Sequence, residues 1–556
     1  MEEILRLKRS NCKNCHKCIR YCPVKAIRFS AGQAHVVENE CILCGMCFSV
    51  CPQDAKLISS DLEKVRVMLT TGPVYASVAP SFAASFPGVG IDALERALVK
   101  LGFQGAEETA VGATIVTREY ERILREEKPN VLISSCCTSV NLLMQKHYPD
   151  TLFALAPVMT PAQAHGQYIK NRNPGAKVVF IGPCIAKKQE AVDSDQLDAV
   201  LSFEELHQWL QAEGIEPERG AADSRPGGKT RLYPTTGGVL NSMEKDPDYT
   251  YIAVDGIKKC AAVLEEVRAG ALHRCFIELS ACQGSCAGGP LLGKQPSGPA
   301  QNTLNIIHYS TSGHFPVERQ EGEDYGRELT PIERLAKQPS QMLIDQMLVR
   351  MGKEDPETRL NCGSCGYNSC QEKAVAIIQG KADLSMCLPY MMEKAQGFSD
   401  AVVNNSPNAI LVLNEDLEVQ KINPVACRLF RVRNEKDVLG EAVDRLMDDT
   451  VFRTVRQTRR NRTNEREYLS EYGCYVDRTV LFNADSHLFI CMMRDVTGEV
   501  ERLEKKMETR LQAVAIADDV AKKQLKIVQD IASLLGETAA DTLIAIDHLK
   551  ETISDD

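Results

Sequence analysis

Cysteine is the residue type through which this sequence could do most of its chemistry. The chain has 556 residues and 22 cysteines, and eight of these lie in the first 51 residues. Residues 12–23 read CKNCHKCIRYCP and residues 41–52 read CILCGMCFSVCP, so the spacing C-x2-C-x2-C-x3-C-P occurs twice. Thiolates at this spacing hold [4Fe–4S] clusters, and the fourth cysteine of each run ligates the other cluster. The sequence therefore predicts two clusters near its start.

The two runs resemble bacterial two-cluster ferredoxins, and residues 1–60 are expected to have that fold. The crossed pattern assigns Cys12, Cys15, Cys18 and Cys51 to one cluster. It assigns Cys41, Cys44, Cys47 and Cys22 to the other. The alternative is zinc, which rarely uses a duplicated run of four cysteines. Such clusters carry single electrons, so the chain is expected to move electrons or to sense their level.

A third cysteine motif lies at residues 362–387, with the spacing C-x2-C-x4-C-x16-C. It resembles the small [4Fe–4S] domain of corrinoid iron–sulfur proteins and of electron-transport subunits. The implied ligands are Cys362, Cys365, Cys370 and Cys387, in a domain spanning residues 340–396. Zinc stays open as the alternative here.

Between residues 70 and 325 the pattern changes to alternating strands and helices, which indicates an α/β fold. Apolar strand segments such as VYASVA, NVLISS, KVVFIG and RCFIELS each end in a turn with a small residue or a cysteine. Chemistry in such folds gathers at the ends of the strands. The cysteines at these ends are Cys136, Cys137, Cys184, Cys282 and Cys286. Four of them could hold another [4Fe–4S] cluster, which would leave one thiol free.

These segments resemble the three active-site signatures of [FeFe]-hydrogenases, in the family's order: SSCC, GPCIAKKQE and ELSACQGSCAGG. APS at residues 79–81, TPAQ at residues 160–163 and TTGGV at residues 235–239 extend the resemblance over roughly residues 70–325. The resemblance implies a domain of two α/β lobes around an H-cluster. That cofactor is a [4Fe–4S] cluster joined to a diiron subcluster with CO, cyanide and a dithiolate.

The resemblance also implies residue roles. Cys136 would be the general acid and base that passes protons to the diiron site, a task suited to a thiol. Lys187 would donate to one cyanide, Glu190 would orient it, and Ser280 would add a hydroxyl near the diiron ligands. The H-cluster ligands would be Cys137, Cys184, Cys282 and Cys286, the last of which bridges to the diiron part. The other cofactor contacts would be Ala79, Pro80, Ser81, Pro161, Gly182 and Pro183.

Several positions depart from the pattern of fast hydrogenases. Thr138 and Val140 stand where the family has Pro and Trp, and Gly182 and Ser280 stand where it has Met. Glycine is expected to leave space beside the diiron unit. Aligning the segment before SSCC places Tyr120 and Ile123 where efficient members have a glutamate relay, with Glu119 beside one of these positions. Slow proton transfer is therefore expected, which suits a sensor better than a fuel enzyme.

The last third of the chain loses the metal pattern. Residues 397–495 resemble a PAS domain, with NSPNAILVLNEDLEVQKINPVA as its opening and Asp495-Val496-Thr497 as its closing hinge. Residues 496–556 predict a coiled-coil signalling helix with heptad-like spacing at Val500, Leu503 and Met507, which Gly536 is expected to break. No kinase domain follows in the sequence. We therefore expect a homodimer that signals to a separate kinase or phosphatase.

The composition of the chain limits the classes of partner that we expect it to bind. The net charge of −10 gives no basic footprint for nucleic acid. The start of the chain lacks the apolar core of a signal peptide, and no run of about 18 apolar residues predicts a membrane span. Short C-x-x-C spacings without a secretory signal favour metal over disulfides. These features favour a cytoplasmic protein that meets H2, protons and a ferredoxin-like electron partner.

The sequence thus predicts a low-turnover sensory [FeFe]-hydrogenase that couples reversible H2 oxidation to a PAS module. Two alternatives stay open. One is a catalytic hydrogenase linked to ferredoxin, with the PAS domain as an accessory. The other is a non-hydrogenase iron–sulfur protein of the same fold.

Overall fold

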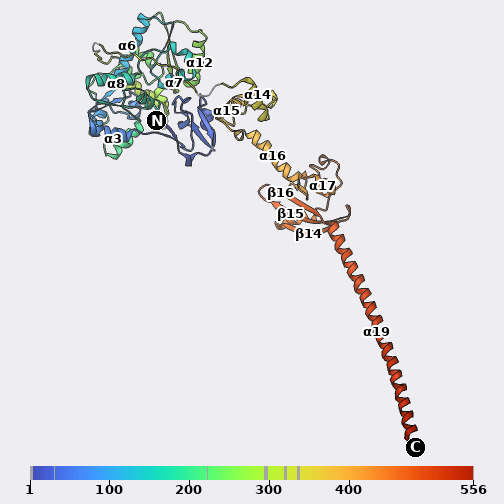
Figure 1. Cartoon of the computed structure of the whole chain (residues 1–556). Coiled ribbons are helices and arrows are strands. Elements are labelled where there is room, and N and C mark those ends of the chain that lie inside the picture. The colour runs from blue at the N-terminus through green and yellow to red at the C-terminus, as the bar shows by residue number, and fades with distance from the viewer. Residues whose placement is uncertain are drawn as a thin grey trace. The chain divides into compact units, whose positions relative to one another are not determined.

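The computed structural model describes residues 4–30, 32–221, 223–292, 298–318, 322–334 and 338–554 (Figure 1). The chain divides into two compact units, Met1–Met391 and Met392–Asp556. None of the helices in the described part of the chain combines the length and the apolar character that a membrane span needs.

The first 60 residues form a repeated unit of two antiparallel strand pairs. β1 (Leu5–Leu7) pairs with β4 (Lys56–Ile58), and β2 (Ile27–Ser30) pairs with β3 (Gln33–Val36). The sequence repeat also repeats in the backbone. The short helices α1 (Lys17–Tyr21) and α2 (Met46–Ser49) each follow a left-handed residue, His16 at φ 55° and Gly45 at φ 72°.

Two parallel sheets form the lobes of the hydrogenase-like region. One has the order β6-β5-β8-β9, with β6 Gly105–Glu108, β5 Val74–Val78, β8 Lys177–Ile181 and β9 Ala199–Leu201. The other has the order β10-β11-β7, with β10 Thr250–Asp255, β11 Cys275–Ser280 and β7 Val131–Ile133. The four strands predicted from the apolar segments are β5, β7, β8 and β11, so the α/β prediction is confirmed. Strands β5, β7, β8 and β11 are largely buried on both faces, which explains their nearly continuous apolar sequences.

Helices separate these strands along the chain. They are α3 (Leu62–Thr71), α4 (Phe82–Ser85), α5 (Ile91–Lys100), α6 (Ala110–Glu126), α7 (Thr138–His147), α8 (Pro161–Arg172), α9 (Lys187–Asp193), α10 (Phe203–Ala212), α11 (Gly238–Ser242), α12 (Ile257–Arg268) and α13 (Pro299–Tyr309).

The region of the third cysteine motif is a small helical domain. Helices α14 (Gln341–Arg350) and α15 (Cys370–Ile378) pack around Ile344, Leu348 and Met351. This domain lies against the N-terminal repeat: the Lys25 ammonium donates to the Gly366 carbonyl at 2.9 Å. The Phe29 N–H donates to the Lys381 carbonyl at 2.7 Å.

The second unit contains a five-stranded antiparallel sheet, as a PAS fold requires. The sheet order is β13-β12-β16-β15-β14, with β13 Val419–Ile422, β12 Ala409–Leu413, β16 Leu488–Asp495, β15 Cys474–Asn483 and β14 Arg462–Leu469. Its helices are α16 (Leu388–Asn404), which begins in the first unit, α17 (Pro424–Leu429) and α18 (Thr450–Thr458).

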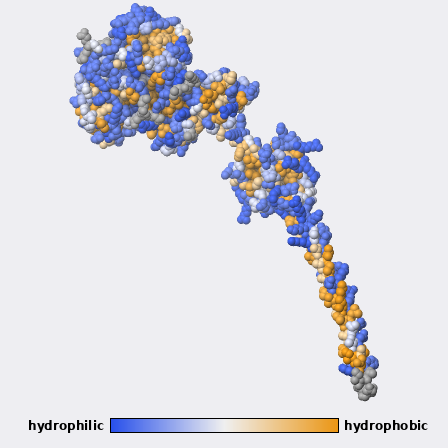
Figure 2. All heavy atoms as spheres, in the orientation of Figure 1, coloured by the Kyte–Doolittle hydropathy of each residue, from blue (hydrophilic) through white to orange (hydrophobic). Residues whose placement is uncertain are grey.

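The chain then continues as α19 (Thr497–Ser554), a helix of 58 residues that is exposed over residues 501–550. Figure 2 shows apolar residues along this helix. Its exposed large apolar side chains include Leu503, Met507 and Leu525. The expected break at Gly536 is wrong, because α19 runs through it. One glycine costs only about 1 kcal/mol in a helix interior, and good helix formers surround it.

Candidate functional site

The predicted site residues lie at the carboxyl ends of the parallel strands. Ala79, Pro80 and Ser81 follow β5, and Ser134 to Cys137 follow β7. Gly182, Pro183 and Cys184 follow β8, and Cys282 follows β11. Both sheets therefore direct their reactive residues towards one region, although these residues are widely separated in the sequence.

The thiols of this region interact electrostatically with one another. Burial raises the pKa of Cys282 well above its usual range, and the charges of Cys137, Cys286 and Cys184 add to that effect. Burial likewise raises the pKa of Cys184 to about 11. Buried thiols that raise each other's pKa need a cation to hold them as thiolates, and a bound metal centre supplies it. The donor set therefore fits an iron–sulfur cluster.

A lysine lies beside these thiols and is held by a buried carboxylate. The Lys187 ammonium donates to Glu190 Oε1 at 2.7 Å and to Oε2 at 2.8 Å. Lys187 is 8% exposed and Glu190 is 1% exposed. The charge of Lys187 lowers the pKa of the Cys286 and Cys184 thiols against the effect of burial.

Two threonines complete the shell of Glu190. Thr138 Oγ1 donates to Glu190 Oε1, and Thr160 Oγ1 donates to Oε2 at 2.8 Å. Sequence reasoning noted Thr138 only as a departure from the family and missed this role. A hydroxyl at the start of α7 and another at the N-cap of α8 was the available signal.

Ser81 carries an unpaired buried hydroxyl. The residue is fully buried, and its Oγ has no hydrogen-bond partner among the described residues. A buried hydroxyl without a partner is costly, so its presence requires an explanation such as a ligand. A cofactor that presents an acceptor such as cyanide would satisfy it, as the resemblance implies for Ala79-Pro80-Ser81.

Three further predicted site residues are Gly182, Ser280 and Pro161. The space expected beside Gly182 is partly filled: a Cβ there would lie 2.6 Å from the Phe180 ring and 3.0 Å from Ala79 Cβ. The Ser280 hydroxyl already pairs with Ser285 Oγ at 3.0 Å. Pro161 begins α8, next to the capping residue Thr160.

Cys136 stands apart from the ligand thiols in its surroundings. Burial raises its pKa to about 12, and the charges of Cys137 and Glu278 act in the same direction. Its thiol donates weakly to Ser134 Oγ at 3.7 Å. The neighbouring Ser135 Oγ pairs with Tyr120 Oη at 2.8 Å. The Tyr120 hydroxyl therefore contacts Ser135, the residue that precedes this thiol.

A buried carboxylate, missed by sequence reasoning, also acts on Cys136. Glu278 lies on β11 and is 1% exposed. Burial raises its pKa to about 7, although it accepts backbone N–H groups from Gly237, Val239 and Leu240 at the start of α11. Gly237 and Val239 belong to the TTGGV segment, and Leu240 follows it.

The N-terminal cysteines group as the crossed spacing predicts for one cluster. Burial raises the pKa of Cys44 to about 12, with added contributions from Cys22 and Cys41. Burial also raises the pKa of Cys47, and the charges of Cys41, Cys44 and Cys22 raise it further. Cys44 also acts on Cys282, so this group is the one that faces the hydrogenase-like site.

The third motif also gathers its cysteines. Cys362, Cys365, Cys370 and Cys387 all line one small cavity of about 20 Å³. Tyr367 lines it too, and burial and the charges of both Cys365 and Cys22 raise the pKa of its hydroxyl. The third motif therefore lies close to the group that contains Cys22.

No group of three or more Cys, His, Asp or Glu side chains is arranged for a single metal ion in the described part of the chain.

Four protein-family models match separate regions of the chain. Residues 72–290 match the C-terminal domain of the iron-only hydrogenase large subunit, and residues 6–58 match a 4Fe-4S dicluster domain. Residues 359–389 match an Fe-S cluster family, and residues 397–496 match the PAS fold.

Two curated relatives share parts of the sequence. The periplasmic [Fe] hydrogenase large subunit of Nitratidesulfovibrio vulgaris is 27% identical over 366 residues, which are 52% of this chain and 86% of that protein. A component of the ion-translocating oxidoreductase complex of Methanosarcina acetivorans is 41% identical over 44 residues. That match spans 8% of this chain and only 17% of that component.

Solved structures are more distant. The [FeFe]-hydrogenase HydA1 of Chlamydomonas reinhardtii is 19% identical and covers 46% of this chain and 91% of its own, with a TM-score of 0.36. A PAS domain from Haloarcula marismortui is 21% identical and covers 19% of this chain and 96% of its own, with a TM-score of 0.16. The family matches and the cysteine groups agree: this chain combines regions that match the C-terminal domain of the iron-only hydrogenase large subunit, two iron–sulfur families and the PAS fold.

Proposed function

We propose that the chain interconverts H2 with protons and electrons and reports the outcome through its PAS domain. The observation that supports this most strongly is the gathering of Cys137, Cys184, Cys282 and Cys286 around Lys187, with Cys136 left over. When bound there, an H-cluster supplies the two-electron chemistry of H2. The four thiols would hold its [4Fe–4S] part.

The chain's own residues have separate tasks in this proposal. Cys136 holds and moves the proton, and Tyr120 and Ser135 form the polar surroundings behind it. Glu190 keeps Lys187 in place, so that the ammonium and the Ser81 hydroxyl bind anionic ligands of the cofactor. Ser280 is proposed to modulate the site together with Ser285. The residues that would line the remaining surface of the cofactor are Ala79, Pro80, Pro161, Gly182 and Pro183.

The electron route would use three accessory clusters. The cluster of Cys22, Cys41, Cys44 and Cys47 would receive electrons first. Beyond the effect of burial, the charge of Cys44 raises the pKa of Cys282, so this group lies near the H-cluster ligands. The cluster of Cys12, Cys15, Cys18 and Cys51 would exchange them with a ferredoxin-like carrier. The cluster of Cys362, Cys365, Cys370 and Cys387 would receive them on a branch, since Tyr367 is influenced by both Cys365 and Cys22.

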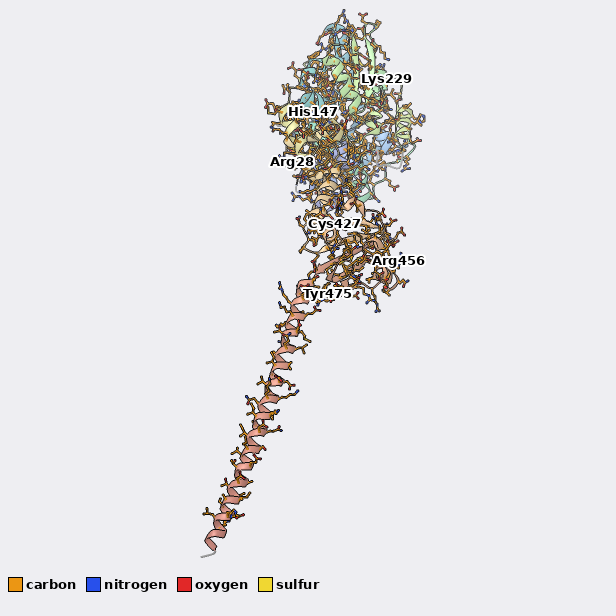
Figure 3. All side chains as sticks on the ribbon, turned by 90° about the vertical axis from the view of Figure 1, so that its right-hand side faces the viewer. Arg28, His147, Lys229, Cys427, Arg456 and Tyr475 are labelled. Carbon is orange, nitrogen blue, oxygen red and sulfur yellow. The ribbon has the colours of Figure 1, made fainter. Side chains whose placement is uncertain are left out.

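The signalling step would occur in the second unit. Figure 3 labels Tyr475, whose N–H donates to Thr497 Oγ1 at 2.9 Å at the start of α19. Thr497 Oγ1 donates in turn to Asp495 Oδ1 at 2.7 Å, which ties the predicted hinge to the sheet. We propose that PAS domains and α19 helices pair in a homodimer that a separate kinase or phosphatase reads.

We propose domain boundaries at 1–60, 70–325, 340–396, 397–495 and 496–556. The function is tested by labelling α19 at Leu525 with a spin label and measuring distances between chains with and without H2. The proposal expects a distance change under H2 that Cys370→Ala abolishes. An unchanged distribution would contradict signalling. Turnover as fast as that of fuel enzymes would favour the ferredoxin-linked catalytic alternative.

A further inference from the structure

The third-motif domain contains a lysine that is buried without a carboxylate partner in the described structure. Lys373 lies on α15 and is 1% exposed, one of the largest fully buried side chains. Its ammonium makes one long described hydrogen bond, to the Leu384 carbonyl at 3.4 Å. No described acidic side chain lies within ion-pair distance of it. Lysine is almost never fully buried unless it is paired, so this position requires a counter-charge.

The groups that face Lys373 identify that counter-charge. Lys373 lines the small cavity together with Cys362, Cys365, Cys370 and Cys387. The strongest electrostatic partners of its ammonium are Cys387 and Cys365, followed by Asp383 and then Cys370. The carboxylate of Asp383 is exposed and already accepts from Ser385 N–H and Oγ. The thiols are therefore the main partners of the buried charge.

We propose that Lys373 is a tuning residue that raises the reduction potential of the iron–sulfur cluster held by Cys362, Cys365, Cys370 and Cys387. This rests on the proposed function, in which those four cysteines hold a [4Fe–4S] cluster. Reduction by one electron adds one negative charge to the cluster. A fixed cation inside the same low-dielectric pocket stabilises the reduced form more than the oxidised form.

A raised reduction potential of the third cluster would draw electrons towards it. The group containing Cys22 lies next to this domain through Tyr367 and the Lys25–Gly366 hydrogen bond. A raised potential makes the third cluster a favoured acceptor for electrons that arrive from the Cys22 cluster. Lys373 thereby stabilises the reduced state of the cluster that precedes the PAS domain in the chain.

The test is a redox titration of the full chain with iron–sulfur clusters assembled, followed by electron paramagnetic resonance. The signal of the third cluster is the one lost in Cys370→Ala. Lys373→Met should disfavour reduction of that cluster by about tenfold or more, which is about 59 mV for one electron. Lys373→Arg, which keeps the charge, should stay near the wild-type value.

Lys353→Met is the matched control. Lys353 lines the same cavity and is 4% exposed, and its charge acts on the exposed thiol of Cys362. Its shift should be smaller than that of Lys373→Met, and an equal or larger shift would overturn the proposal. So would an unchanged potential in Lys373→Met.

If Lys373→Met loses the cluster, Lys373→Gln and Lys373→Arg supply the comparison. The Gln variant must then titrate below the Arg variant, and equal potentials overturn the proposal. Failure of the underlying function has a different signature: the wild-type chain would then show no [4Fe–4S] signal that depends on Cys370.

Discussion

Cysteines in the two units of this molecule behave differently, although both units contain several of them. In the first unit Cys260 and Cys275 lie in the apolar core, and the other cysteines lie after strand ends or in short motifs, where the thiols of each group face one another. In the second unit Cys427, Cys474 and Cys491 are spread through an apolar core, and Figure 3 shows Cys427 within that domain. The spacing of cysteines in the sequence and the closeness of their thiols, rather than the number of cysteines, therefore indicate where metal chemistry takes place.

The largest expected effect separates two adjacent cysteines of the first unit. Cys136→Ala should lower H2-dependent proton exchange by about 10²–10⁴-fold, because a positioned proton carrier is lost. Iron content should stay unchanged. Isotope exchange between H2 and heavy water, with iron analysis, measures both quantities. Cys137→Ala is the matched variant and should lose iron; the reverse pattern would exchange the two roles.

A buried carboxylate gives the stability of the first unit a pH dependence. The folded pKa of Glu278 is raised from 4.5 to about 7, so the folded state holds the extra proton between these values. Stability should therefore be highest below about pH 4.5 for this group and fall as pH rises to about 7. The full loss is about 3 kcal/mol.

Glu278→Gln removes this titration. The thermal midpoint of the hydrogenase domain, measured between about pH 5 and pH 8, should fall more steeply in wild type than in the variant. Parallel profiles would show that Glu278 keeps an ordinary pKa.

Glu190 holds Lys187 in the first unit through two hydrogen bonds. Glu190→Gln should lower activity by about 10–100-fold, as changes next to a metal site typically do, and shift the cyanide stretching bands. Glu205→Gln is the control, because Glu205 lies 3.9 Å from the adjacent Lys188 and caps α10. Matching spectra in wild type and Glu190→Gln would exclude a role through Lys187.

The smallest effect tests the second unit. Cys491→Ser places a hydroxyl in a fully buried site and should destabilise the PAS domain by about 1–3 kcal/mol, with iron content unchanged. Cys427→Ser, at a half-buried position, should cost less. Denaturant unfolding and iron analysis check both variants. Iron loss in either one would place a metal site in the PAS core.

Much of this organisation was predictable from sequence because the motifs carry their own spacing. The repeated C-x-x-C runs, the apolar strands that end at cysteines, and the PAS pattern are all local signals. The Glu190 shell is different, because Thr138 at the start of α7 and Thr160 at the N-cap of α8 reach Glu190 only through the tertiary fold. Lys373 was hidden for a similar reason: nothing local shows that a lysine on α15 turns into a pocket. Gly536 misled because a long helix outweighs one weak residue.

The central proposal is an H-cluster at the strand ends of the first unit. Infrared spectroscopy of the chain matured with the diiron unit, with and without H2, tests this most directly. We expect CO and cyanide bands that require Cys286 and change reversibly under H2. Absence of these bands, or bands that H2 leaves unchanged, would contradict it.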